Sequence, residues 1–249
     1  MQIKFNRYIA TIGAHSLLLL TLLLSACSFT KKTASPVIDL RNQQALNRGY
    51  HVVNRGETLY FIAWRFDKDY RELAHTNHLN PPYHLRVGEK IYLYSKADNN
   101  VYRPTINKQV ISKHKRPTIY SAKPYVRVKR WLVPAQGSVI QTYSGSGLNK
   151  GINIAGKLGE AIRATAAGEV VYAGSSLRGY GKLLLIKHND LYLSAYAHNK
   201  TLLVHEGDTV KAGQTIALMG STGANRVMLH FELRKRGKPV NPLKYIKLT

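Results

Sequence analysis

Hydrophobic and polar positions divide the chain into four stretches of different character. Residues 8–24 form an almost unbroken apolar run. Residues 50–94 combine regular hydrophobic spacing with turn residues, whereas residues 99–130 are polar, basic and free of acidic side chains. Residues 131–249 carry short apolar runs separated by glycines. Each pattern predicts a different kind of structure.

The stretch from Tyr50 to Tyr94 predicts a small βααβ domain. Residues 50–53 alternate as in a strand. The apolar positions of a first helix then recur at helical spacing: Leu59, Ile62, Ala63 and Phe66. Asp69 with Glu72 resembles a capping box that opens a second helix. Prolines end that helix, and residues 90–93 form the second strand.

The C-terminal stretch predicts an all-β domain. Its apolar runs are short, rich in β-branched and aromatic residues, and bounded by turn residues. The clearest runs are residues 169–173, 182–186, 191–196, 214–218 and 229–233. Short strands at this spacing are typical of a sandwich or a barrel.

The N-terminus predicts export and a lipid anchor. Lys4 and Arg7 precede the apolar run, which indicates a secretory signal peptide over residues 1–26 that is too short to span a membrane. Cys27 is the single cysteine, so no intramolecular disulfide is possible. The run Leu24-Ser25-Ala26-Cys27 resembles a bacterial lipobox, which implies acylation of Cys27. Ser28 after it implies the outer membrane; a chance cysteine is the alternative.

Composition adds a strong positive charge. The chain has 37 Lys+Arg against 13 Asp+Glu, a formal net charge of +24. This balance suits nucleic acid, anionic lipid or the polymers of a bacterial wall, and export makes nucleic acid an improbable partner. Residues 27–48 are polar and predict a flexible lipidated tether. Residues 95–130 predict a disordered basic linker, either a solvated spacer or an adhesive segment for an anionic surface.

Residues 49–94 closely resemble the LysM module. The resemblance rests on Tyr50–Leu59, Ile62-Ala63, Asn77 and Val87-Gly88. It implies binding of N-acetylglucosamine-containing glycans of peptidoglycan in a shallow groove between two loops. The implied glycan-binding residues are Gly56, Glu57, Thr58, Leu59, Asn80, Pro81, Pro82 and Tyr83. A βααβ domain without a ligand is the alternative.

Residues 131–249 resemble the lysostaphin/LytM family of zinc endopeptidases. The shared motifs include Tyr196-Ala197-His198, Gly207–Gln214 and Leu229–Glu232. The resemblance implies an all-β fold like the duplicated hybrid motif. Lipoyl or biotinyl carriers also use a Gly-Asp hairpin, but no turn presenting a modifiable lysine is evident here.

The zinc ligands of that family are missing from this chain. The resemblance implies a His, an Asp four residues later and the second His of a His-x-His strand. The first two positions are Asn149 and Asn153, and the strand motif is Met228-Leu229-His230. Because a catalytic zinc needs three imidazole or anionic ligands, we expect no metal, no cofactor and no catalytic residue. The vacated groove, lined by Asn149, Asn153, His198, Met228 and His230, is then expected to bind a partner.

The lipobox, the LysM module and the degenerate LytM/lysostaphin-like peptidase domain together resemble NlpD-type murein hydrolase activators. The resemblance implies a peptidoglycan-binding lipoprotein at the periplasmic face of the outer membrane. It also implies a function at the division septum, where the protein switches on a periplasmic N-acetylmuramoyl-L-alanine amidase. A structural tether between membrane and wall is the alternative, and an active zinc murein endopeptidase is a weaker one.

Overall fold

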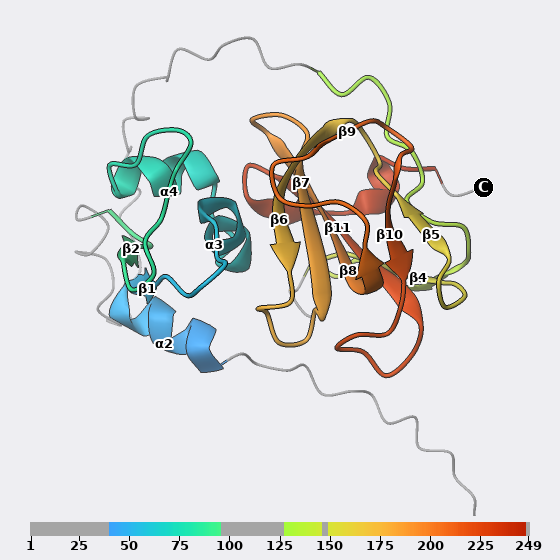
Figure 1. Cartoon of the computed structure of the whole chain (residues 1–249), viewed down its shortest axis with the longest axis horizontal. Helices are drawn as coiled ribbons and strands as arrows, with labels where there is room; N and C mark the ends of the chain where they lie inside the picture. The colour runs from blue at the N-terminus through green and yellow to red at the C-terminus, as the bar shows by residue number, and fades with distance from the viewer. Residues whose placement is uncertain (1–39, 96–126, 146–148, 248–249) are drawn as a thin grey trace, which may run out of the picture. The chain divides into compact units, whose positions relative to one another are not determined.

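The computed structural model describes residues 40–95, 127–145 and 149–247 (Figure 1). The predicted signal peptide, Cys27 and most of the predicted linker lie outside the described residues. Within these three ranges, every helix falls short of the length and apolarity needed to cross a bilayer.

The predicted βααβ order is confirmed in the N-terminal part. The elements are α2 (Leu40–Arg48), β1 (Tyr50–Val52), α3 (Leu59–Arg65), α4 (Tyr70–Thr76) and β2 (Lys90–Tyr92). The two strands pair antiparallel, with Tyr50 opposite Tyr92. Thr58 caps α3 by accepting a hydrogen bond from the Phe61 amide, and Asp69 caps α4 in the same way. We call the part from β1 to β2 the βααβ module.

The chain immediately before this module is helical, so the flexible tether predicted through Arg48 is wrong for residues 40–48. Helix α2 contacts β1, Ala45 is buried, and Leu46 packs against the core. The sequence of this helix is mostly polar, so the pattern alone does not indicate its contact with the core.

The C-terminal part is the predicted all-β domain, which we call the β-rich domain. Its strands are β3 (Val139–Gln141), β4 (Ile152–Ala155), β5 (Ala161–Arg163), β6 (Gly168–Gly174), β7 (Lys182–Lys187), β8 (Tyr192–Leu202), β9 (Thr209–Val210), β10 (Thr215–Met219), β11 (Met228–Lys235) and β12 (Lys238–Val240). A 3₁₀ turn, η2 (Pro242–Lys244), follows. All five strand runs predicted from the sequence correspond to strands of this sheet.

The long strand β8 organises the sheet. The main order is β3-β4-β11-β8-β7-β6-β9, and β10 pairs with both β5 and β8 (Figure 1). The first part of β8 pairs with β11 and its last part with β10. Along β11, Leu229, Phe231 and Leu233 point into the core, because side chains alternate between the two faces of a strand. The intervening residues, from Met228 to Arg234, lie on the opposite face.

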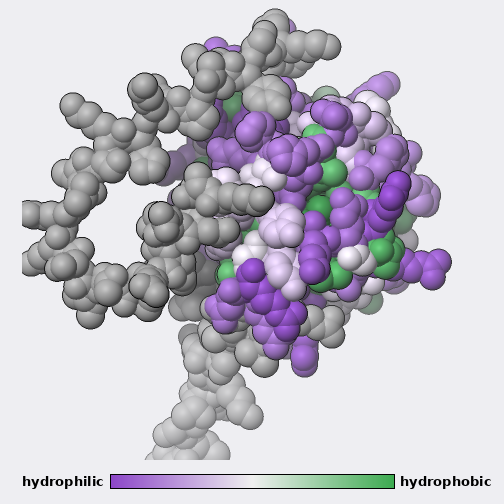
Figure 2. Space-filling view, turned by 90° about the vertical axis from the view of Figure 1, so that its left-hand side faces the viewer, coloured by the Kyte–Doolittle hydropathy of each residue, from purple (hydrophilic) through white to green (hydrophobic). Residues whose placement is uncertain are grey.

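The βααβ module and the β-rich domain share one hydrophobic core. Residues of α3 cluster with residues of β6 and β7, and the Phe61 ring stacks on Tyr172 with centroids 4.3 Å apart. A second cluster, around Ile154, Tyr196 and Phe231, lies within the β-rich domain alone. The face seen in Figure 2 is largely hydrophilic, with small apolar patches between the polar side chains.

Candidate partner-binding and glycan-binding sites

Sheet register brings the predicted zinc-position residues together. His230 of β11 lies opposite Asn153 of β4 on one side and opposite Ala197 of β8 on the other. His198 follows Ala197, and its ring centroid lies 6.1 Å from that of His230. Met228 is on the same face of β11, two residues before His230. Asn149 lies just before β4, so we refer to these five predicted residues as the His230 cluster.

A chain of hydrogen bonds runs through the centre of the His230 cluster. The Asn153 amide donates to Gln141 Oε1 at 2.6 Å, and Asn153 Oδ1 lies 2.6 Å from His230 Nδ1. His230 Nε2 lies 3.0 Å from Glu232 Oε1. Asn149 donates separately to the Thr142 carbonyl at 2.8 Å. The polar atoms at the zinc positions are therefore engaged in bonds within the protein.

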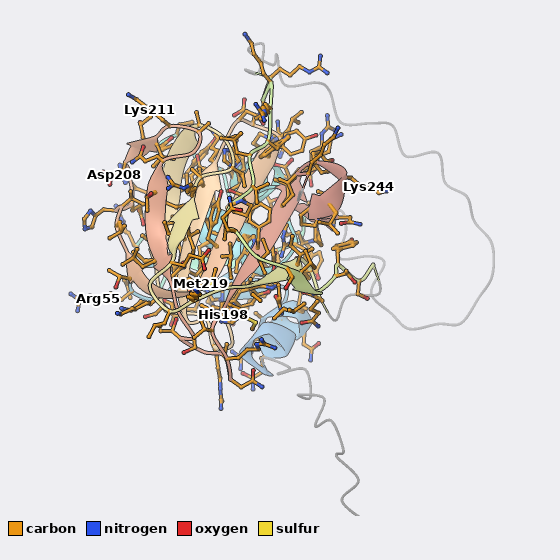
Figure 3. All side chains as sticks on the ribbon, turned by 90° about the vertical axis from the view of Figure 1, so that its right-hand side faces the viewer. Arg55, His198, Asp208, Lys211, Met219 and Lys244 are labelled. Atoms are coloured by element: carbon orange, nitrogen blue, oxygen red, sulfur yellow. The ribbon has the colours of Figure 1, made fainter. Side chains whose placement is uncertain are left out.

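His198 is held as a neutral imidazole. Its Nδ1 lies 2.9 Å from the Thr222 carbonyl, to which it donates. Burial lowers the pKa of His198 to about 4, and the nearby His230 acts in the same direction. The His198 backbone has a positive φ of 66°, which is uncommon for a side-chain-bearing residue. Met219, at the end of β10, pairs with Asn199, the residue that follows His198; Figure 3 labels both Met219 and His198.

Glu232 carries a buried negative charge next to the His230 cluster. Burial by itself favours the neutral acid, but Arg234 and His230 more than offset it, so the pKa of Glu232 is held well below its usual range. Arg234 donates to Glu232 Oε2 from both Nε, at 2.8 Å, and Nη2, at 2.6 Å. The Tyr180 hydroxyl donates to Oε1 at 2.9 Å. A buried carboxylate with this many donors is stable only while each donor stays in place.

These residues do not fit a catalytic zinc. An amide oxygen is a poor zinc donor without charge, and the amides of Asn149 and Asn153 are already hydrogen-bonded. Met228 offers only a thioether. Across the described residues, no three His, Cys, Asp or Glu side chains gather as a metal site would require. Among the five residues of the His230 cluster, only the imidazoles of His198 and His230 are strong zinc ligands.

The accessible part of the His230 cluster is small. Four members are buried, with exposed fractions of 6% for Asn149 and His198, 7% for Asn153 and 8% for His230. Met228 is the one member that is half-buried. A partner at this surface would therefore contact Met228 most directly, and the roles of all five residues stay predictions.

The two predicted glycan loops lie on the βααβ module at the start of α3 and after α4. Gly56, Asn80, Pro81 and Pro82 are exposed, and Tyr83 closes a turn by donating its amide to Asn80 at 2.8 Å. Exposed backbone at these positions is what recognition of acetamide groups requires.

Two of the predicted glycan-binding side chains face inward instead. Leu59 is 1% exposed and belongs to the core. The Glu57 carboxylate is buried and lies 2.6 Å from His51 Nε2 and 3.3 Å from Arg65 Nη1. Burial opposes ionisation of Glu57, but His51 and Asn54 outweigh it and lower its pKa. Glu57 and Leu59 can offer a glycan only their backbone, so their side chains shape the loop.

Sequence patterns did not reveal several polar and aromatic residues at these sites. Tyr60 and Tyr70 lie with ring centroids 4.6 Å apart, and each lies 6.0 Å from Tyr83 beside the second loop. Tyr180 and Glu232 adjoin the His230 cluster. The motif Leu229–Glu232 includes Glu232, but the contacts of its carboxylate with Tyr180 and Trp64 come from outside β11.

Comparison with known protein families assigns both parts. Residues 51–93 match the LysM domain, and residues 147–242 match peptidase family M23. The LysM match begins after α2, and the M23 match begins after β3 and ends within η2.

Similar proteins combine the same two parts. The lipoprotein NlpD/LppB homolog of Pseudomonas aeruginosa is 42% identical, over 94% of this chain and 92% of its own length. The murein hydrolase activator NlpD of Escherichia coli K12 is 40% identical, over 79% of this chain and 67% of its own length. Among solved structures, the catalytic domain of lysostaphin from Staphylococcus simulans is 28% identical over 44% of this chain and 89% of that chain, with a TM-score of 0.39.

Proposed function

Because the chain belongs to the NlpD family of murein hydrolase activators, we propose that it activates a periplasmic N-acetylmuramoyl-L-alanine amidase and cleaves no wall bond itself. Its LysM domain binds peptidoglycan, and this binding brings the protein to the substrate of that amidase. The names of its relatives support activation of a murein hydrolase. The choice of an amidase rests on the resemblance and awaits the experiment below.

One observation carries the non-catalytic part of the proposal. The hydrogen-bonded series Gln141–Asn153–His230–Glu232 includes two of the three positions, Asn153 and His230, at which the resemblance places zinc ligands. Hydrogen bonds thus join β4 to β11 at these two positions, in place of a shared metal. Without a metal, nothing lowers the pKa of an attacking water to near neutrality.

Activation requires that the His230 cluster favour the open form of its partner. A binding surface shifts a two-state enzyme only by the difference between its affinities for the two states, and a nearly complete shift needs about 5 kcal/mol. Met228 suits such a surface, because a flexible thioether side chain adapts to an apolar helix. Its half-burial leaves it available to a partner.

The proposed location follows from the N-terminus. Acylation of Cys27 would anchor the protein in the outer membrane with the remaining chain in the periplasm. Relatives named as lipoproteins support attachment to the envelope. Placement at the division septum follows from the amidase proposal and shares its test.

Stimulation of amidase by the mature chain on purified peptidoglycan is the decisive measurement. Met228→Glu should reduce stimulation at sub-saturating concentration about tenfold or more, because a charge desolvated at an interface costs a few kcal/mol. Leu203→Glu is the matched control, since Leu203 is 47% exposed, follows the last residue of β8 and is not a member of the His230 cluster. Equal stimulation by both variants, or none by the unmodified chain, would leave the structural tether as the better account.

Metal content separately tests the proposal that the chain is not itself a catalyst. After dialysis against zinc, the unmodified chain should retain far less than one zinc per chain. Asn149→His with Asn153→Asp restores the family's ligand types beside His230, and this double variant should bind about one zinc. Stoichiometric zinc in the unmodified chain would revive the endopeptidase alternative.

A further inference from the structure

Helix α3 of the βααβ module packs directly on the β-rich domain. Phe61 is fully buried and stacks on Tyr172 of β6. The Thr58 hydroxyl, at the start of the helix, donates to the Val171 carbonyl at 2.9 Å. Two elements separated by more than a hundred residues therefore form one packed interface.

Trp64 is the residue of α3 that contacts the side chains next to the His230 cluster. It is 3% exposed, and its indole Nε1 donates to Glu232 Oε2 at 3.2 Å. Its ring meets Tyr180 edge to face, with centroids 4.9 Å apart. Tryptophan buries a large area and still needs a partner for its N–H, and this contact supplies both.

Both neighbours of Trp64 contact His230. Glu232 Oε1 lies 3.0 Å from His230 Nε2, and the Tyr180 ring centroid lies 5.5 Å from that of His230. Tyr180 also donates its hydroxyl to Glu232. A single side chain, either Glu232 or Tyr180, therefore links Trp64 to His230, and a hydrogen bond joins these two linking side chains to each other.

Charged groups reinforce the same interface. Arg234 forms an ion pair with Asp67, which follows α3, and Lys150 lies 2.7 Å from the same carboxylate. Arg234 also donates to the Trp64 carbonyl at 3.4 Å. Withdrawing α3 would remove Asp67 and the Trp64 carbonyl from this buried arginine and leave its ion pair with Glu232, and the loss of partners by a buried charge is costly.

We propose that Trp64 is a positioning residue for the His230 cluster: through Glu232 and Tyr180 it fixes the orientation of His230. The βααβ module then supports the residues of the partner-binding surface, in addition to being the wall-binding domain. This inference deepens the proposed function and rests on it only where amidase stimulation is the readout.

The orientation of His230 can be measured without an amidase. The His230 ring signals of the full mature chain, assigned by comparison with His230→Gln, are recorded by NMR for Trp64→Phe and Trp64→Ala. Trp64→Phe removes the indole donor and keeps a smaller aromatic ring, and Trp64→Ala removes the ring as well. The His230 signals should move in both variants and further in Trp64→Ala. Trp131→Phe is the control, because Trp131 contacts His188 and Tyr245 instead.

Packing of the βααβ module on the β-rich domain is tested by cutting the chain between them. A protease site is placed within residues 96–126, and the cleaved protein is passed over a sizing column. The two fragments should co-elute at micromolar concentration, and Trp64→Ala should weaken their association about tenfold or more, as expected for a buried interface tryptophan. Fragments that separate in the unmodified protein would overturn the proposal.

The NMR result also decides against the proposal if the His230 signals stay unchanged in folded Trp64→Ala. With an active amidase, Trp64→Phe should lower stimulation several-fold while Trp131→Phe leaves it unchanged; equal stimulation by the two would contradict a positioning role. If the unmodified chain stimulates no amidase, the proposed function fails. The NMR and cleavage experiments still test the role of Trp64 in that case.

Discussion

At the scale of single residues, the difference between Asp and Asn at position 153 accounts for the hydrogen bonding of the His230 cluster. An amide both donates and accepts, so Asn153 joins Gln141 on one side to His230 on the other. An ionised Asp has no proton to donate to Gln141 Oε1. Asn153 is therefore suited to a site that is held together by hydrogen bonds in place of a metal.

His198 should make the protein sensitive to acid. Its pKa falls from 6.5 to about 4 because the folded protein buries the neutral ring. The unfolded chain then binds a proton at a higher pH than the folded one. The resulting stability is complete above pH 6.5 and is lost as the pH falls from there towards 4. Between pH 7 and 4.5 the loss is about 2–3 kcal/mol from this group alone.

Urea unfolding of the unmodified chain and of His198→Gln, each at pH 7 and at pH 4.5, isolates this contribution. The unmodified chain should lose about 2–3 kcal/mol more than the variant across that interval. His188, whose pKa burial also lowers to about 4, contributes equally to both proteins and cancels. A direct titration that found His198 protonating near its usual value would contradict the expectation.

The members of the His230 cluster could be predicted from sequence because they occupy motif positions that a family pattern fixes. The contacts of Glu232 could not. Strand alternation places Arg234 on the same face as Glu232, but nothing in the spacing along the chain brings Tyr180, from a loop, or Trp64, from α3, to this carboxylate. Such a network depends on strand register and on tertiary packing, neither of which follows from local pattern.

At the scale of secondary structure, prediction succeeded where burial is periodic. The helical stripe from Leu59 to Phe66 became α3, and the longer apolar runs became β6, β7, β8, β10 and β11. It missed α2, whose contact with the core is narrow. It also gave no bounds for the two- and three-residue strands β3, β5, β9 and β12. These pair at irregular or peripheral positions of the sheet, where tertiary hydrogen bonds define a strand that its own sequence does not.

The turn between β11 and β12 provides a test of packing between elements. Gly237 has a φ of 73°, and a Cβ there would lie 2.0 Å from the Lys68 carbonyl oxygen next to α4. Gly207 has a φ of 90° with nothing within 4 Å of such a Cβ. Alanine at either site incurs the backbone strain of a positive φ, about 1 kcal/mol. Gly237→Ala also forces the two backbones apart, which should cost about 1–3 kcal/mol more.

Urea unfolding of Gly237→Ala and Gly207→Ala measures that difference directly, since the two variants share the strain of a positive φ. Gly237→Ala should also increase the exposure of Trp64, detectable as a red shift in fluorescence when Trp131 is replaced by Phe. Equal unfolding free energies for the two glycine variants would show that the turn does not pack against the βααβ module in solution.

At the scale of the whole molecule, the sequence predicts two domains joined by a linker, with no indication that they contact each other. The apolar part of the interface includes Tyr172, which belongs to a run predicted as a strand, and Phe61, which lies off the predicted helical stripe of Leu59, Ile62, Ala63 and Phe66. A hydrophobic residue at a helical position looks the same whether it faces its own domain or another. Sequence periodicity therefore predicts burial and leaves the burying partner open.

The net charge of +24 and the LysM domain offer two physically distinct ways to hold the wall. Attraction between exposed charges extends over a Debye length of about 10 Å at 0.1 M salt and is largely screened at 0.5 M. Glycan recognition by loop backbone acts at contact distance and should persist. Binding of the mature chain to purified sacculi should therefore fall between 0.05 M and 0.5 M salt to a plateau above zero.

The binding that remains at 0.5 M salt identifies what the glycan loops recognise. Soluble oligomers of N-acetylglucosamine should compete for it, because their acetamide groups match the exposed backbone of Gly56 and of Asn80 to Pro82. Cello-oligosaccharides of equal length share the β-1,4-linked backbone and lack the acetamide, so they should compete poorly. If both sugars compete equally, the acetamide is not the recognised group. If salt abolishes all binding, the positive charge of the chain explains its retention on the wall, and the LysM loops contribute nothing measurable.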